Sequence, residues 1–156
     1  MISTIVVALD GSEASDRTLP VLRQLAEPNG VRLEIVHVRE VLVGRAAGPL
    51  RVNEDELIER VKARAAELHQ SGYDTHLHIE KTVGGQPAHV IADLAEQSGA
   101  DLIITGTRGH GPVAGLVLGS VTMRLLHVAP CPVVVVPSTV AAEGGRPEAS
   151  TVTTTA

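Results

Sequence analysis

Aromatic side chains are almost missing from this sequence. Of its 156 residues, 44% are hydrophobic but only 1% are aromatic, and Tyr73 is the single aromatic residue. The core must therefore be aliphatic, and the chain is long enough for one domain with such a core. Aromatic stacking platforms for single-stranded nucleic acid, cages for methylated amines and interfacial aromatic belts are excluded, because each needs several rings.

Cysteine and basic charge are also scarce. Cys131 is the only cysteine, so no internal disulfide can form. Thirteen basic residues against eighteen acidic ones give a net charge of −5, and the basic residues are scattered, so we expect no nucleic-acid partner. The first residues, MISTIVVALD, lack a basic region and a cleavage site, and the uncharged stretch 125–142 contains three prolines. We therefore expect a cytoplasmic protein that does not enter a membrane.

Short β-branched runs alternate along the chain with longer segments of helical spacing. Four runs are nearly continuous in hydrophobicity, as in strands buried on both faces of a parallel sheet: 2–9, 31–38, 102–105 and 133–136. Residues 75–82 instead alternate polar and apolar side chains, which predicts a half-exposed strand at the sheet edge. This βαβ order predicts a doubly wound parallel sheet.

Four helices are predicted between the strands. The first covers 13–27, with Val21, Leu22 and Leu25 on its buried face, although Pro20 must kink it or delay its regular part.

The other three helices carry terminal signals. Asn53 and Glu56 resemble a capping box at the start of the second helix, whose apolar stripe is Leu57, Val61, Ala65 and Leu68. Pro87 suits the first turn of the third helix, and Gly99 ends it. Its predicted buried face consists of Val90, Ile91, Leu94 and Ala95. The fourth helix covers 120–128, with Val121, Leu125 and Val128 as its apolar positions.

The last residues differ in composition from the rest. Residues 138–156 are rich in Ser, Thr, Ala and Gly and have almost nothing to bury. We expect one folded domain over residues 1–137 and a disordered tail over 138–156.

Glycines gather after the run 102–105, where a parallel sheet binds its ligands. Five glycines lie between positions 106 and 119, and Ser120 then opens a helix. Glycine lets backbone N–H groups approach a phosphate, a helix amino terminus offers unpaired donors, and Ser120 can both cap the helix and donate to a phosphate oxygen. Arg108 adds a fork of donors. The alternative is that the glycines only permit tight turns and that Ser120 only caps its helix.

Two familiar phosphate motifs do not fit this loop. A Walker A sequence needs a lysine, which the loop lacks. The run 109–114 satisfies a loose dinucleotide pattern, but it follows the fourth strand and has no acidic residue about twenty positions later. We therefore exclude a P-loop NTPase and do not expect a dinucleotide site.

The spacing that fits is Gly106-x2-Gly109-x9-Gly119-Ser120, and with it the sequence resembles the universal stress protein family. The other matching segments, in family order, are Asp10-Gly11-Ser12, residues 101–109, residues 119–122 and residues 131–137. The resemblance covers about residues 1–137. Some members of that family bind ATP through this glycine loop, and this chain keeps every position of the loop.

The resemblance implies a three-layer α/β fold, Rossmann-like and similar to the adenine nucleotide alpha hydrolases. It has a five-stranded parallel sheet of order 3-2-1-4-5 and four helices. It implies ATP with Mg²⁺ as the ligand. Asp10 would contact the ribose or hold the nucleotide-bound Mg²⁺, and Val38 would contact adenine through its backbone. It also implies a homodimer through the edge strand 133–136, which agrees with the need to pair an apolar edge. The full set of implied nucleotide-binding residues is Ala8, Asp10, Val38, Thr105, Gly106, Thr107, Arg108, Gly109, Gly119, Ser120, Val121 and Thr122.

Each candidate side chain also has a structural interpretation. Asp10 could be an N-cap or an Asx turn before the first helix, and Arg108 could be a solvated loop charge. His110 lies in the glycine loop without a nearby carboxylate in sequence to orient it, so we assign it no catalytic role. His76 and His78 share a strand face without further metal ligands, and Cys131 suits a small buried site between two prolines.

The sequence leaves four functions open. The first is an ATP-binding regulatory module of a stress response, and the second is a slow ATPase or other nucleotide hydrolase, for which no strong water-positioning residue is present. The third is a cyclic AMP binder using the same pocket, and the fourth is a nucleotide-free dimerisation module. We expect the first, with at most weak ATPase activity. Because no ring can stack on a base, phosphate contacts should carry much of the affinity.

Overall fold

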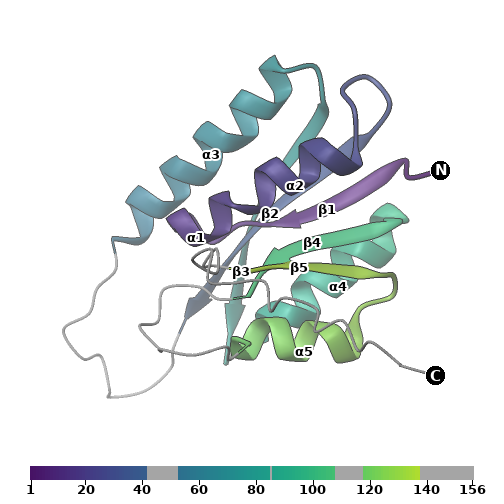
Figure 1. The fold of residues 1–156 in the computed structure, drawn as a ribbon. Coiled ribbons are helices and arrows are strands. Elements are labelled where there is room, and N and C mark those ends of the chain that lie inside the picture. Colours follow the sequence, from purple (N-terminus) through teal and green to yellow (C-terminus); the bar gives the residue numbers. More distant parts are fainter. Residues whose placement is uncertain (42–52, 85, 108–117, 138–156) are drawn as a thin grey trace, which may run out of the picture.

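The computed structural model describes residues 1–41, 53–84, 86–107 and 118–137. Within them, strands and helices follow the predicted order (Figure 1). The strands are β1 (Thr4–Ala8), β2 (Arg32–Val41), β3 (Asp74–Val83), β4 (Leu102–Gly106) and β5 (Val133–Val136). The helices are α1 (Glu13–Asp16), α2 (Thr18–Leu25), α3 (Glu54–Gln70), α4 (Pro87–Ser98) and α5 (Ser120–Val128). The predicted tail at 138–156 lies outside the described residues.

The five strands form one parallel sheet in the order β3-β2-β1-β4-β5, which confirms the predicted topology. Ile5 of β1 pairs with Leu33 of β2 on one side and with Leu102 of β4 on the other. The first half of the chain therefore adds β2 and β3 on one side of β1, and the second half adds β4 and β5 on the other side. The point at which strand order reverses lies between β1 and β4, where α/β folds bind ligands outside the strand ends.

Helices cover both faces of the sheet, giving the predicted three layers. Figure 1 shows α1, α2 and α3 on one face and α4 and α5 on the other. Two aliphatic clusters fill these layers, one centred on Ile5, Ile35 and Ile104 and the other on Val6 and Ile103. Tyr73 is buried in the first cluster, where its hydroxyl donates to the Ala26 carbonyl at 2.8 Å.

The first helical segment is divided, in contrast to the single helix predicted. It consists of α1 and α2, separated at Arg17. Pro20 is the third residue of α2, where a missing N–H costs no helical hydrogen bond, so the proline lies near a helix start. The buried face contains Leu19 and Leu22, whereas Leu25 is 42% exposed, contrary to the prediction.

Helix ends largely match the sequence signals. The apolar stripe of α3 is buried as predicted, but the side chain of the N-cap residue Asn53 makes no capping hydrogen bond, so the capping-box prediction is wrong. Helix α4 begins at Pro87 and ends at Ser98, and its C-cap residue Gly99 has a left-handed φ of 62°, as predicted. Helix α5 covers the predicted residues, but its N-cap is Gly119 rather than Ser120. None of the helices in the described part of the chain is both long and apolar enough to cross a membrane.

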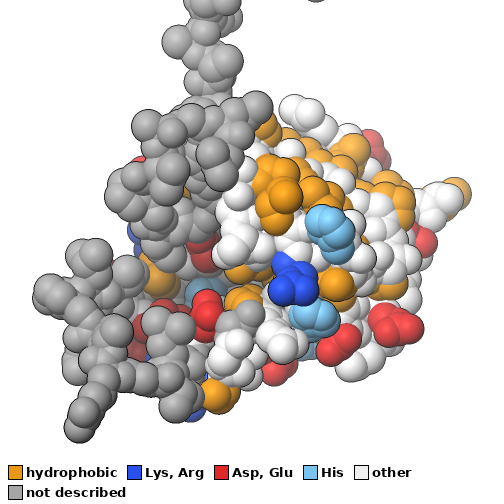
Figure 2. All heavy atoms as spheres, turned by 90° about the horizontal axis from the view of Figure 1, so that it is seen from below, with side chains coloured by type: hydrophobic (Ala, Val, Ile, Leu, Met, Phe, Trp, Pro, Cys, Tyr) orange, Lys and Arg blue, Asp and Glu red, His pale blue; other side chains and the backbone are white. Residues whose placement is uncertain are grey.

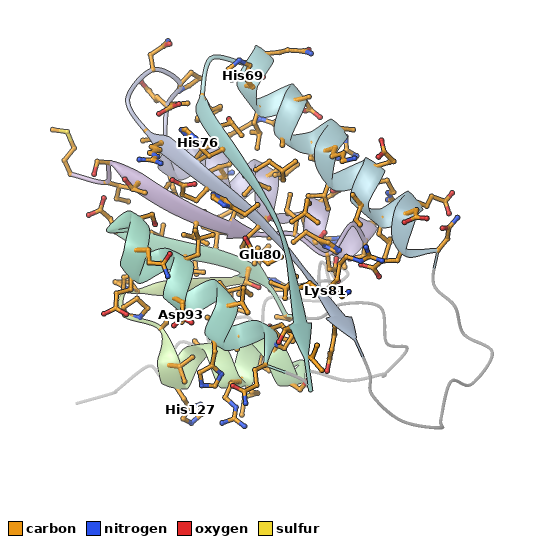
Figure 3. All side chains as sticks on the ribbon, turned by 180° about the vertical axis from the view of Figure 1, so that it is seen from behind. His69, His76, Glu80, Lys81, Asp93 and His127 are labelled. Atoms are coloured by element: carbon orange, nitrogen blue, oxygen red, sulfur yellow. The ribbon has the colours of Figure 1, made fainter. Side chains whose placement is uncertain are left out.

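Strand β3 is an edge strand of the sheet, as predicted. Figure 3 shows this edge from behind, with Glu80 and Lys81 along the strand. The predicted alternation of burial is wrong. Leu77 and Ile79 are 37% and 36% exposed, whereas His78 is partly covered. The reason is a side-chain hydrogen bond between neighbouring strands, because His78 Nε2 lies 2.6 Å from Oε2 of the buried Glu34 in β2.

Candidate functional site

A pocket of about 300 Å³ lies at the carboxyl ends of β1, β2 and β4, where strand order reverses. Its far wall comes from the start of α4 and the first turn of α5. Residues from five separate segments therefore meet there. The lining residues are Ala8, Leu9, Asp10, Ser15, Val36, His37, Val38, Glu40, Pro87, Ile91, Thr105, Gly106, Val121 and Thr122.

Seven of the twelve residues proposed from the resemblance line this one pocket. They are Ala8, Asp10, Val38, Thr105, Gly106, Val121 and Thr122. Thr107 and Ser120 are chain neighbours of the lining residues Gly106 and Val121, and Gly119 precedes Ser120, but none of the three is part of the lining. Arg108 and Gly109 lie outside the described residues, as does His110.

The turn after β1 confirms the structural interpretation of Asp10 as an Asx turn. Asp10 Oδ1 accepts the Ser12 backbone N–H at 2.9 Å and the Ser12 hydroxyl at 2.5 Å, as in an Asx turn. Ser12 is the N-cap of α1, and its hydroxyl oxygen accepts the Ser15 N–H at 3.1 Å. Asp10 is thus held in place by the turn while it lines the pocket.

The end of β4 and the start of α5 are tied together. The Gly119 N–H donates to the Thr107 carbonyl at 2.8 Å, and the buried Thr122 hydroxyl donates to the Gly106 carbonyl at 2.9 Å. These bonds bring the described ends of the glycine loop to one side of the pocket. The first turn of α5, whose amide N–H groups have no partner earlier in the helix, starts at this point.

The backbone of β2 continues past the end of β1. The Leu9 N–H donates to the Val36 carbonyl at 2.9 Å, and β1 ends at Ala8. Because alternate residues of a strand face the same neighbour, Val38 directs its N–H and C=O to the side on which β1 has ended. Backbone donor and acceptor groups therefore stand at this end of the pocket, beside Pro87 and Ile91 of α4.

Several lining residues were not predicted as site residues. His37 is 4% exposed, and its ring lies 2.9 Å from both the Leu9 carbonyl and Oε1 of Glu54. Glu40 and Ser15 add a carboxylate and a hydroxyl to the lining, and Pro87 and Ile91 come from a helix predicted only to pack. The signal available for His37 and Glu40 was their position at the end of a buried strand.

The other candidate side chains do not form a site. Within the described ranges, no group of three or more His, Cys, Asp or Glu side chains is arranged to hold a metal ion. His76 Nε2 lies 3.1 Å from Asp74 Oδ1, whereas His78 on the same strand face contacts Glu34, so the two histidines have different partners. Burial raises the pKa of the Cys131 thiol, and the negative charge of Asp101 adds to this effect.

Comparison with known proteins identifies the family. The model of the universal stress protein family matches residues 1–137. This chain belongs to that family. The "universal stress protein in QAH/OAS sulfhydrylase 3'region" of Thermus aquaticus is 35% identical over 140 residues, which cover 87% of this chain and 99% of the relative.

Solved structures agree in fold. The structure of hypothetical protein MJ0577 is 25% identical, covers 88% of this chain and 96% of its own, and superposes with a TM-score of 0.66. A universal stress protein solved in complex with cAMP is 27% identical, covers 88% of this chain and 98% of its own, and has a TM-score of 0.54. The recognition from the sequence motifs and the predicted fold class are therefore confirmed.

Proposed function

We propose that this universal stress protein binds an adenine nucleotide, ATP with Mg²⁺, in the pocket at the ends of β1, β2 and β4. The observation that carries the proposal is the convergence of seven motif residues from β1, β2, β4 and α5 on one pocket. A family member that is 27% identical was solved with cAMP, which supports an adenine nucleotide as the ligand class.

The phosphates would lie between β4 and α5. Gly106 has no Cβ to obstruct them, and the α5 amino terminus offers amide N–H groups and a favourable dipole. Ser120, at the first position of α5, would add a hydroxyl. Thr107, Arg108, Gly109 and Gly119 complete the proposed phosphate site.

The nucleoside would lie over β1 and β2. Adenine would bond to the backbone groups of Val38 and rest on Ala8 and other aliphatic side chains, because no aromatic residue is available to stack on it. Asp10 supplies a carboxylate of the kind that accepts from ribose hydroxyls or binds Mg²⁺. The lining thus supplies a carboxylate, backbone groups and a glycine, which fit the ribose, the adenine and the phosphates of the nucleotide.

The proposed output is regulatory: binding would change the conformation or the partners of the protein in a stress response, with at most weak ATP hydrolysis. The homodimer would form through β5, the last strand of the sheet. We place this activity in the cytoplasm, as the sequence composition leads us to expect. Cyclic AMP is the second candidate ligand, favoured by the related cAMP complex.

Parallel titration separates these functions. Calorimetry with ATP, ADP, AMP and cyclic AMP, each with Mg²⁺, should show the tightest binding for ATP. The affinity for AMP should be lower than that for ATP by about tenfold or more, because each charged phosphate hydrogen bond is worth roughly 1.5–3 kcal/mol. Phosphate release should be slow or absent over the same period.

Other outcomes contradict specific parts of the proposal. Folded protein that gives no heat with millimolar ATP would exclude nucleotide binding. AMP binding as tightly as ATP would contradict the proposed phosphate site. Tighter binding of cyclic AMP than of ATP would support the second candidate ligand. Rapid phosphate release from ATP would indicate an enzyme.

A further inference from the structure

Among the described residues, the first turn of α3 is connected to the pocket lining through the buried side chain of His37. Glu54, the first residue of α3, does not line the pocket. Its Oε1 lies 2.9 Å from His37 Nε2, while His37 Nδ1 lies 2.9 Å from the Leu9 carbonyl. Leu9 stands between Ala8 and Asp10, two of the proposed nucleotide contacts. The ring thus connects helix α3 to the turn that carries Asp10.

The hydrogen-bond chemistry fixes the direction of these contacts. A carbonyl oxygen only accepts, so His37 Nδ1 must carry a proton and donate to Leu9. His37 Nε2 faces a carboxylate and donates to it when the ring is protonated. Arg39 Nε lies 3.6 Å from the same Glu54 oxygen and provides further positive charge, while Asp10 and Glu40 are the carboxylates in the pocket lining.

The same turn of α3 also packs directly on the Asp10 turn. A Cβ on Gly11 would lie 2.7 Å from the Leu57 carbonyl oxygen, so the two backbones are in close contact. Farther along α3, Arg64 pairs with Asp16 of α1 at 2.8 Å, which raises the pKa of Arg64. Of these three contacts, only the one made by Glu54 leads into a pocket-lining side chain.

We propose that Glu54 and His37 are positioning residues for the nucleotide: Glu54 orients the His37 ring, and the ring holds the Leu9–Asp10 backbone in the shape that the ligand requires. The start of α3 would thereby control the affinity of a pocket that it does not touch. This inference rests on the proposed nucleotide binding.

The test uses the full chain and a matched control on the same helical turn. Glu54→Ala removes the contact with His37, whereas Glu56→Ala removes the same charge from an exposed position of that turn. Glu54→Ala should weaken ATP binding about tenfold, within the range of couplings in one hydrogen-bond network, and Glu56→Ala should leave it unchanged. Glu54→Gln should restore most of the affinity, because its amide can donate to the unprotonated Nε2 of a neutral ring.

A double variant shows whether Glu54 acts through His37. His37→Asn keeps a donor near the Leu9 carbonyl but is too short to meet Glu54, so Glu54→Ala should have no further effect in that background. Hydrogen exchange of the Ser12 N–H, which is bonded to Asp10, should accelerate in Glu54→Ala and not in Glu56→Ala. This exchange reports on the turn even without ligand.

The outcomes separate the two proposals. If Glu54→Ala and Glu56→Ala bind ATP equally, or if Glu54→Ala has its full effect in the His37→Asn background, the positioning role is wrong. If the wild-type protein binds no ATP, the proposed function fails, and the Ser12 exchange decides whether Glu54 and His37 hold the Asp10 turn: faster exchange in Glu54→Ala alone supports this structural part of the inference, and equal exchange overturns it.

Discussion

At the scale of single residues, the backbone of Gly11 shows how closely the Asp10 turn is packed. Gly11 has φ of +79°, and an added Cβ would meet backbone and side-chain atoms of Leu57 at 2.7–2.9 Å. Gly84 has the same φ of +79°, but no atom of the described residues lies within 4 Å of the added Cβ. The two positions therefore share one backbone strain and differ in crowding.

We expect Gly84→Ala to lower the free energy of unfolding by about 1–2 kcal/mol from left-handed strain alone. Gly11→Ala should lower it by roughly a further 1–3 kcal/mol, because the Leu57 backbone cannot move aside cheaply. Urea unfolding of both variants measures the difference. Equal losses would show that the turn can shift away from α3.

Some of the site residues could be predicted from local sequence and others could not. Asp10 comes two residues after β1 and Gly106 is the last residue of β4, so their place at the carboxyl edge of the sheet follows from the strand prediction alone. The role of His37 depends on Leu9 and Glu54, which lie 28 and 17 positions away in the chain. Nothing in the residues around His37 indicates those partners, since they are set by the packing of α3 on the sheet.

At the scale of elements, continuous hydrophobic runs made four of the strands easy to predict, although β5 is an edge strand in which only Val136 is buried, not a strand buried on both faces. The run 133–136 coincides with β5, and 102–105 is β4 without its last residue. The position of the edge strand β3 was predicted correctly, but the burial of its side chains was not. The contact between Glu34 and His78 forms between two strands and cannot be seen in the sequence of β3 alone. The division between α1 and α2 was also missed, although Pro20 pointed to an irregularity near that position.

The starts of β1 and β4 are joined by one exposed carboxylate. Asp101 Oδ2 accepts the backbone N–H groups of Ser3 and Thr4 at 2.7 and 3.0 Å and the Ser3 hydroxyl at 2.9 Å. The hydrogen bond from the Ser3 backbone, followed by those from Thr4 and the Ser3 hydroxyl, lowers the pKa of Asp101 below its ordinary value. The folded state therefore favours the ionised form.

This carboxylate predicts a pH-dependent contribution to stability. A lowered folded-state pKa stabilises the protein above the ordinary carboxyl pKa of about 4, and the contribution is lost as the pH falls through the folded-state value. Asp101→Ala should therefore have a lower free energy of unfolding than wild type at neutral pH. The difference between the two free energies should become smaller as the pH is lowered below about 4. Denaturant unfolding across this pH range measures the difference.

Asp93, on the exposed side of α4 in Figure 3, provides the control. Asp93→Ala removes a carboxylate of the same kind from a helix surface. The difference in the free energy of unfolding between this variant and wild type should not become smaller as the pH falls. A difference for Asp101→Ala that stays constant with pH would mean that its hydrogen bonds do not favour the ionised form.

At the scale of the whole molecule, the pocket and the proposed dimer edge lie on different parts of the sheet. The pocket is formed at the carboxyl ends of β1, β2 and β4, whereas β5 is the last strand of the sheet. Among the described residues on the face in Figure 2, basic side chains are few, and the most prominent one lies next to histidine side chains. Because the pocket and the proposed dimer edge lie on different parts of the sheet, a local change in the backbone of β5 can test the dimer separately from nucleotide binding.

The two sides of β5 can be told apart residue by residue. The carbonyls of Pro132 and Val136 accept N–H groups of Ile103 and Thr107, so even-numbered residues bond toward β4. By the alternation of a strand, Val133 and Val135 direct their N–H and C=O groups away from β4. A proline at 135 would remove one outward donor and leave the ladder to β4 intact, whereas a proline at 134 would break that ladder.

We therefore expect Val135→Pro to convert the proposed dimer to a folded monomer with ATP affinity close to that of wild type, because the change lies outside the pocket lining. Val134→Pro should lose stability as well, since it removes an internal hydrogen bond of the sheet. Sedimentation equilibrium of wild type and Val135→Pro, with circular dichroism as the check on folding, measures the effect. A folded Val135→Pro variant that stays dimeric would place the interface on another surface, and a wild-type monomer at high concentration would contradict the dimer itself.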